Sequence, residues 1–397
     1  MILDKRSVIF ILYVIVFTMD SVLNYFFDVP LFVLSLMLYC GLLTIPGFFS
    51  IKNYKDFLIV LFCFSISFCF NLIKEGFYKE SLSDYLFIIS FFGSFYLFSD
   101  LKHFKPEKKL ISFFLICSLF LFLATFAGFD KNIWGNTIGL KTDDIEFSRS
   151  YRQGFFRKSH IASYFFTFIL LYFFNRFKVN GAHKFKYAFL AIPLVSIIFL
   201  TGSRTSIVVI LLGLFMYYFK AKFLKYLIAL ASFLVFVVVF IDKILVLFSN
   251  TVVYQYLTII KTISSNFGRL SRVIIWSSWW QEVRTFGLFD FIFGRGFNSS
   301  IEANWKNVSY SIWFHNDFLS ISYSYGILPL ILYVVLFVNI FKKHKEVIRN
   351  NIFIFLAFSS LWLSAFFNGF YYYFTILLLY LFYAMIYEKN EVGDIRY

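Results

Sequence analysis

The sequence predicts an all-α, polytopic integral membrane protein with about twelve transmembrane helices. Of its 397 residues, 60% are hydrophobic and 24% aromatic, and only 15% are charged. Apolar runs recur along almost the whole chain, and basic residues gather in every second connection between them. A soluble protein of this length could not bury so much apolar surface. We therefore expect residues 1–397 to form a single membrane domain.

The individual spans follow from the length of each apolar run, since crossing the hydrocarbon takes about 20 mostly apolar residues. In the first half these runs lie at 8–27, 31–49, 57–73, 85–99, 110–129 and 160–176. In the second half they lie at 186–201, 204–220, 223–241, 316–341, 352–368 and 370–387. Pro193 and Pro329 fall inside two of these runs and predict kinks there.

Lysine and arginine occupy alternate connections, which the positive-inside rule assigns to the cytoplasm. Basic groups precede the first run and follow the second, fourth, sixth, eighth and tenth runs: Lys5, Arg6, Lys52, Lys55, Lys102, Lys105, Lys108, Lys109, Arg176, Lys178, Lys184, Lys186, Lys220, Lys222, Lys225, Lys342, Lys343, Lys345 and Arg349. Both termini are therefore predicted to face the cytoplasm. The same excess explains most of the net charge of +15, so we expect no nucleic acid partner.

Two long polar connections fall on the opposite, outer side of the membrane. The first outer loop covers 130–159, and the second covers 242–315, between the ninth and tenth runs. The second loop is the longest segment that is not a continuous apolar run, and it contains a cluster of arginines. Because no ATP is present on that side, chemistry there needs an activated substrate delivered through the membrane.

Arg204 is the first candidate, because it stands in a Gly-Ser-Arg-Thr turn between apolar residues 197–200 and 207–210. An arginine inside the bilayer costs about 2.5–3.5 kcal/mol on insertion scales unless it meets an anion or a water-filled cavity. An arginine that snorkels from a helix end is the structural alternative. We favour a functional role because small residues and hydroxyl groups surround the charge.

Arg269 and Arg272 are three residues apart and share a helix face that Trp276, Trp279 and Trp280 continue. This pattern is typical of an amphipathic helix at the membrane interface, with its rings at the headgroup level. A guanidinium group binds a phosphate through two parallel hydrogen bonds, which an ammonium group cannot do. A purely structural interfacial helix is the alternative.

Three further arginines are candidates for binding a diphosphate or a glycan. Arg295 lies in a Phe-Gly-Arg-Gly turn of the second outer loop. Arg152 and Arg157 form a basic patch at the end of the first outer loop, immediately before an apolar run. For this patch a structural role is an equal alternative.

His315 stands where the second outer loop enters an apolar run, beside Asn316 and Asp317. A histidine with an unperturbed pKa of about 6.5 exchanges a proton near neutral pH. Without a cluster of cysteine, histidine or carboxylate ligands it makes a poor metal site, so we expect no metal and no cofactor. Its imidazole is a candidate general base or hydrogen-bond donor, and Asp317 and Glu282 are alternative bases.

Five short motifs in a fixed order resemble those of the O-antigen ligase/polymerase superfamily, which contains the Wzy-type polymerases and the WaaL-type ligases. They are Gly-Ser-Arg-Thr at 202–205, Arg-x-x-x-Trp at 272–276, Phe-Gly-x-Gly at 293–296, His-Asn-Asp-Phe-Leu at 315–319 and Tyr-Gly-Ile-Leu at 325–328. The motifs cover about residues 200–330, and the layout of predicted spans matches over most of the chain.

This resemblance implies a metal-independent, inverting glycosyltransferase at the periplasmic face of the bacterial inner membrane. An O-antigen polymerase transfers a growing glycan from undecaprenyl diphosphate onto the next lipid-linked repeat unit. The arginines and loop histidine of the family correspond to Arg204, Arg272 and His315, which are therefore the expected catalytic residues. The expected partners are the undecaprenyl-diphosphate-linked oligosaccharide substrate, membrane lipid and a protein that regulates chain length.

Two other functions remain open at this point. An O-antigen ligase shares the motifs and the layout, and transfers the glycan to the lipid A-core instead. We prefer the polymerase because polymerases are the more numerous and diverse sequences. A flippase or transporter for lipid-linked oligosaccharide would need polar residues along several helices, whereas Asp20, Asn71 and Asn368 are nearly the only polar interruptions.

Overall fold

The computed structural model contains twelve helices and no strand in the part of the chain that it describes, which confirms the all-α prediction. The described residues are 31–45, 50–100, 159–180, 204–219, 271–309, 313–367 and 375–394, with a few isolated positions between them. The predicted spans at 8–27, 110–129, 186–201 and 223–241 and the first outer loop at 130–159 lie wholly or almost wholly outside these residues, as do Arg152, Arg157, Pro193 and Arg269.

Helices occupy most of every other predicted run. They are α2 (Leu31–Leu43), α3 (Ile51–Glu75), α4 (Lys79–Phe98), α7 (Ser159–Asn180), α9 (Arg204–Phe219), α17 (Ile327–Asn350), α18 (Ile352–Phe367) and α19 (Thr375–Asp394). Among the described residues, α3, α4 and α17 are long and apolar enough to cross a bilayer. The chain therefore contains helices suited to a membrane.

Several helices share one end of the bundle, which we call the basic end. There the side-chain amide of Asn53, at the start of α3, donates to the carbonyl of Tyr96 near the end of α4, at 2.9 Å. At the same end, Lys343 of α17 donates to the carbonyl of Ser99 at 2.6 Å. The start of α3, the end of α4 and the C-terminal part of α17 therefore lie together.

A buried polar cluster adds α7 and α19 to the basic end. The hydroxyl of Tyr172 donates to Glu388 at 2.9 Å, and the guanidinium of Arg176 lies 3.5 Å from the same carboxylate. Beside them Asn351, at the start of α18, donates to Asn175 at 2.6 Å. Because Glu388 is almost fully buried, these partners offset the cost of removing its charge from water.

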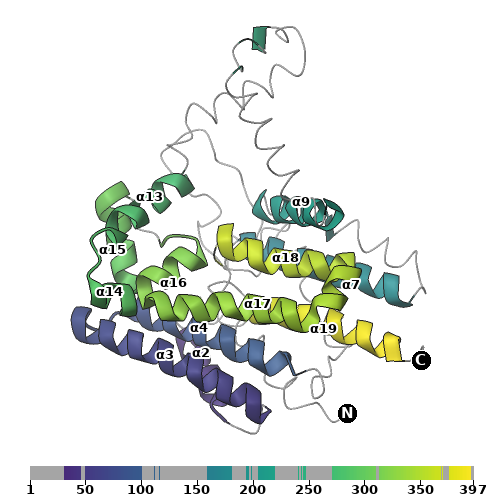
Figure 1. Ribbon diagram of the computed structural model, residues 1–397, viewed down its shortest axis with the longest axis horizontal. Helices are drawn as coiled ribbons and strands as arrows, with labels where there is room; N and C mark the ends of the chain where they lie inside the picture. Colours follow the sequence, from purple (N-terminus) through teal and green to yellow (C-terminus); the bar gives the residue numbers. More distant parts are fainter. Residues whose placement is uncertain are drawn as a thin grey trace.

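The opposite end, which we call the loop end, carries the second outer loop. Figure 1 shows α13 (Ser271–Val283), α14 (Leu288–Phe293) and α15 (Phe297–Val308) gathered there, beyond the C-terminal end of α3. Lys74, in the last turn of α3, forms an ion pair with Asp290 of α14 at 2.6 Å. The described part of this loop is thus folded onto the helices.

The prediction of one continuous helix over 316–341 is wrong, because two helices cover this range. Gly326, with φ +87°, ends α16 (Asp317–Tyr325) and begins α17. Pro329 falls in the first turn of α17, where its missing N–H has no intrahelical partner to lose, so it does not interrupt the helix. The non-helical residue inside α17 is instead His344.

Two motif glycines let two backbone segments cross at the loop end. Gly294 follows α14 and has φ +79°, and a Cβ there would overlap the backbone of Ser324. A Cβ on Gly326 would likewise overlap the carbonyl oxygen of Ile292. The Phe-Gly-x-Gly and Tyr-Gly-Ile-Leu motifs are therefore two sides of one close backbone contact.

The crossing also satisfies the last carbonyls of α16, which have no partner within their own helix. The amide of Arg295 donates to the carbonyl of Tyr323 at 2.7 Å, and the amide of Gly296 donates to that of Ser324 at 3.2 Å. The side-chain amide of Asn71, on α3, also donates to Ser324, at 2.8 Å. This polar interruption of an apolar span thus anchors the outer loop to α3.

Replacing Gly326 by alanine is expected to destabilise the fold by about 2–5 kcal/mol, from the left-handed backbone and the overlap together. Thermal unfolding of the detergent-solubilised protein would show this as a Tm lowered by about 5 °C or more. Gly287→Ala is the matched control, because Gly287 has φ −79° and open space around its Cβ position. Equal Tm values for the two variants would contradict this account of the crossing.

Candidate active site at the loop end

The histidine loop, residues 313–316, passes across the loop end just before α16. His315 has φ 53°, a left-handed conformation that few residues other than glycine adopt. Its imidazole is half-buried and lies with its ring centre 4.9 Å from that of Trp313. Such backbone outliers are kept only where the surroundings impose them, and they cluster at functional sites.

Helix α13 holds this loop through two side chains one turn apart. The guanidinium of Arg272 donates from Nη1 to the backbone carbonyl of His315, at 3.3 Å. The indole of Trp276 donates to the carbonyl of the preceding residue, Phe314, at 3.2 Å. Two separately predicted features, the Arg-x-x-x-Trp motif and the loop histidine, are therefore in direct contact.

Of the neighbouring tryptophans Trp279 and Trp280 of α13, one packs against the protein and the other is exposed. Trp279 turns inward, and its indole donates to the hydroxyl of Ser322 on α16 at 3.3 Å. Trp280 is 51% exposed, and the guanidinium of Arg284 lies 4.7 Å from the centre of its ring. Trp280 therefore lies on the surface of the described part of the chain, and the interfacial position of α13 stays a prediction.

The residues that follow His315 start α16. The side chain of Asn316 caps the helix by accepting from the amide of Leu319 at 3.1 Å. Asp317 is fully buried and accepts a hydrogen bond from the hydroxyl of Tyr333 on α17. Asp317 has the contacts of a residue that joins α16 to α17, and its role as an alternative base stays a prediction.

Arg295, a predicted substrate-binding residue, is surrounded by partners from its own loop. Its guanidinium reaches Asp290 at 2.9 Å, Glu282 at 3.3 Å and the carbonyl of Thr285 at 2.9 Å. It also lies 4.5 Å from the ring centre of Phe286. These are the contacts of a residue that holds α13 and α14 together. Glu282, the other alternative base, is one of the two carboxylates in this ion-pair network.

The carboxylate of Asp290 is stabilised in its charged form. Burial alone would raise its pKa, but hydrogen bonds from Lys74 and Arg295 and their positive charges outweigh burial and lower it below its ordinary value of 3.8. A lowered pKa means that this carboxylate contributes stability above its unfolded-state pKa and loses it as pH falls through the folded value. The ion pairs are therefore complete at neutral pH and fail only in acid, below about pH 4.

Arg295→Ala is expected to loosen the outer loop by about 1–3 kcal/mol, because it removes the cation paired with Glu282 and one of the two cations paired with Asp290. Limited proteolysis of the solubilised protein would show faster cleavage within 271–309. Arg284→Ala removes an arginine from the same loop whose ring contact is solvent-exposed, so its cleavage rate is expected to change little. Equal acceleration in both variants would contradict the structural role of Arg295.

Arg204 is the first residue of α9, and the packing of α9 on α18 shows which end of the bundle it occupies. Gly213 lies against Leu356, and the ring centres of Tyr217 and Phe355 are 5.4 Å apart, so the two helices are antiparallel. At a rise of about 1.5 Å per residue, the backbone of Arg204 therefore lies level with the C-terminal end of α18.

That end of α18 contacts the outer loop directly. The ring of Phe366 lies 5.5 Å, centre to centre, from the ring of Trp276 on α13. The structure thus brings Arg272 and His315 into contact, and it places the backbone of Arg204 at the same end of the bundle. Trp313, whose ring packs beside that of His315, is a site residue that the sequence analysis does not predict. The signal that could have indicated it is its position two residues before the loop histidine.

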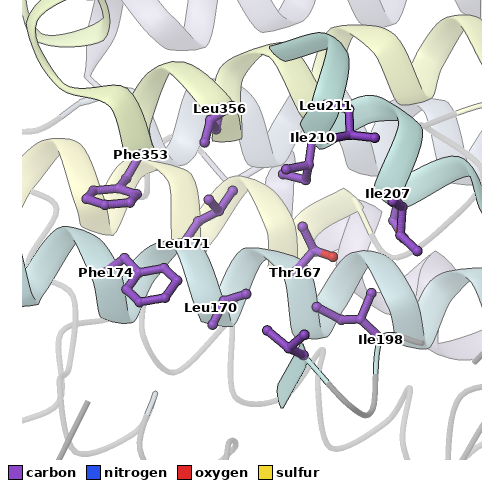
Figure 2. Close-up of a pocket in the computed structure, with 12 residues that line it drawn as sticks. Thr167, Leu170, Leu171, Phe174, Ile198, Ile207, Ile210, Leu211, Phe353 and Leu356 are labelled. Atoms are coloured by element: carbon purple, nitrogen blue, oxygen red, sulfur yellow. The ribbon is translucent and has the colours of Figure 1, made fainter. Parts of the chain in front are cut away.

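An apolar pocket of about 250 Å³ begins beside the first turns of α9. Figure 2 shows aliphatic and aromatic side chains of α7, α9 and α18 lining this space. Two lining residues carry hydroxyl groups, Thr167 and Ser206, and the latter is hydrogen-bonded to Ser163. The pocket therefore suits a hydrocarbon chain and lies within two turns of Arg204.

No protein-family model matches the chain, and no curated protein is significantly similar to it. Within the described ranges no three histidine, cysteine, aspartate or glutamate side chains are grouped in a way that could hold a metal ion. The three cysteines in those ranges, Cys40, Cys63 and Cys69, are not joined in disulfides.

Proposed function

We propose that this chain is a surface-polysaccharide (O-antigen) polymerase. It is a metal-independent, inverting glycosyltransferase that transfers a growing glycan from undecaprenyl diphosphate onto a lipid-linked repeat unit, at the periplasmic face of the bacterial inner membrane. The observation that carries the proposal is the contact between Arg272 and the carbonyl of His315. This contact brings together the guanidinium of Arg272, which we propose binds the diphosphate, and His315, which we propose accepts a proton.

The arginines act on the leaving group. When the glycosidic bond breaks, negative charge builds on the diphosphate, and cationic donors that are already in place stabilise this charge more than they stabilise the substrate. A planar guanidinium has five N–H donors, and bidentate binding of a phosphate uses two of them. Arg272 and Arg204 are the groups that we assign to the diphosphate.

His315 acts on the acceptor. Its imidazole takes the proton of the attacking sugar hydroxyl, the oxygen forms a bond to the anomeric carbon, and the carbon–oxygen bond to the diphosphate breaks on the opposite side. One glycosidic bond replaces another, so no oxidant or metal is needed. The left-handed backbone and the hydrogen bond from Arg272 fix where this imidazole can reach.

The pocket beside α9 supports a lipid-linked donor. Its lining is almost wholly hydrocarbon, and it starts two residues after Arg204. An isoprenoid chain in this space would place its diphosphate at the N-terminal end of α9, where the amide groups of the first turn favour an anion. The proposed partners are the lipid-linked oligosaccharide, membrane lipid and, as the resemblance of the motifs implies, a chain-length regulator.

Lipopolysaccharide gels from a strain lacking this gene, with and without a plasmid copy, test the proposal. A polymerase predicts core with a single repeat in the deletion strain and a restored ladder on complementation. A plasmid carrying Arg272→Ala should leave the single repeat. Bare core with long chains accumulating on the lipid carrier would identify a ligase instead, and an unchanged ladder in the deletion strain would reject both.

A further inference from the structure

A second and larger groove lies at the basic end, away from the proposed active site. It has a volume of about 690 Å³ and runs between the C-terminal part of α9, α17 from Phe337 to Arg349 and α18 from Phe355 to Trp362. Figure 1 shows α17 and α18 side by side, with α9 against α18. Nothing in the proposed transfer reaction uses this space.

The two parts of the groove differ in chemistry. One part is lined by hydrocarbon, and its rim includes Val338 and Trp362, which are 42% and 40% exposed. The other part carries three exposed cations, Lys342, Lys345 and Arg349. Apolar and cationic walls in one groove are complementary to an amphipathic anion.

The cations and the apolar part belong to one groove. Val338, Lys342, Lys345 and Arg349 all line it, on both sides of the non-helical residue His344 in α17. No aspartate or glutamate is among the described residues that line the groove. Glu346, the nearest acidic residue along α17, is not among the lining residues, so the lining has a net positive charge.

We propose that this groove binds one anionic glycerophospholipid of the bilayer, with an acyl chain along the apolar part and the headgroup phosphate at Lys342, Lys345 and Arg349. The volume is within the usual range for a small-molecule site. Basic pockets between membrane helices attract anionic headgroups, and each lysine or arginine near the surface contributes about 1 kcal/mol. The site is separate from the one proposed for the lipid-linked donor.

Native mass spectrometry of the purified full chain tests this with dioleoyl phosphatidylglycerol and with phosphatidylcholine that has the same chains. We expect tighter binding of phosphatidylglycerol, weakened about fivefold by Lys345→Gln and about a hundredfold by Gln at all three positions, since 1 kcal/mol is about fivefold. Lys389→Gln is the matched control, because it removes an exposed charge outside the groove and should leave affinity unchanged.

Val338→Trp tests the apolar part without changing charge, and it should weaken both lipids. Equal affinities for the two lipids, or equal effects of Lys345→Gln and Lys389→Gln, would overturn the proposal. Preferential binding of undecaprenyl phosphate over phosphatidylglycerol would overturn it as well, because the groove would then belong to the carrier lipid. Loss of polymerase activity plays no part in this measurement, so the two proposals fail independently.

Discussion

His315→Ala is expected to abolish polymer formation while the protein remains in the membrane at its normal level. Removing a positioned general base typically costs 10²- to 10⁴-fold in rate, which is enough to remove a ladder from a gel. Arg204→Ala should have the same effect, because it removes a cation assigned to the diphosphate. Chain length on a gel, with membrane levels measured by immunoblot, checks both variants.

The left-handed backbone of His315 provides the control. Glycine and asparagine tolerate this conformation, so His315→Gly and His315→Asn keep the loop but lack a base that is active near neutral pH. If the imidazole carries the chemistry, all three variants are inactive. Restored chains in His315→Gly would show that only the backbone matters, and near-normal chains in His315→Ala and Arg204→Ala would remove the assigned site.

Arg272→Lys is expected to lose most activity although it keeps the positive charge. A lysine is a point charge that cannot bind a phosphate through two parallel hydrogen bonds, and removing one preorganised donor costs about 10²- to 10³-fold. Initial rates of chain extension measure this loss. Arg284→Lys, in the same helical region, should keep wild-type activity. Full activity of Arg272→Lys would indicate that the positive charge alone is enough and that two parallel hydrogen bonds to the phosphate are not needed.

Hydropathy predicted most of the described helices because those helices are formed by long apolar runs, which are visible in the sequence. The helices α13, α14 and α15 lie in the polar loop, where no such run exists. It placed no boundary at Gly326, because one glycine in an apolar run barely changes a window average. The break there depends on a neighbour, the backbone of Ile292, which is far away in sequence. Pro329 was the more obvious helix breaker, yet its place in the first turn makes it harmless.

In the candidate site, too, the sequence shows which residue types are present, and only the fold shows which of them are in contact. Arg272 and Arg295 are alike in sequence, since both are arginines of one polar loop. Only the fold shows that one contacts the histidine loop while the other is held by Asp290 and Glu282. The contact between Arg272 and His315 spans 43 residues, and no local pattern predicts it.

Transfer by the purified protein in lipid nanodiscs, supplied only with a lipid-linked repeat unit, tests the central claim most directly. The wild-type chain should form products of two or more repeats and release one undecaprenyl diphosphate for each new linkage, without added metal. Arg272→Lys and His315→Gly should leave the repeat unit unextended. A folded wild-type protein that leaves the unit unchanged, or that extends it only when lipid A-core is supplied, would contradict the account.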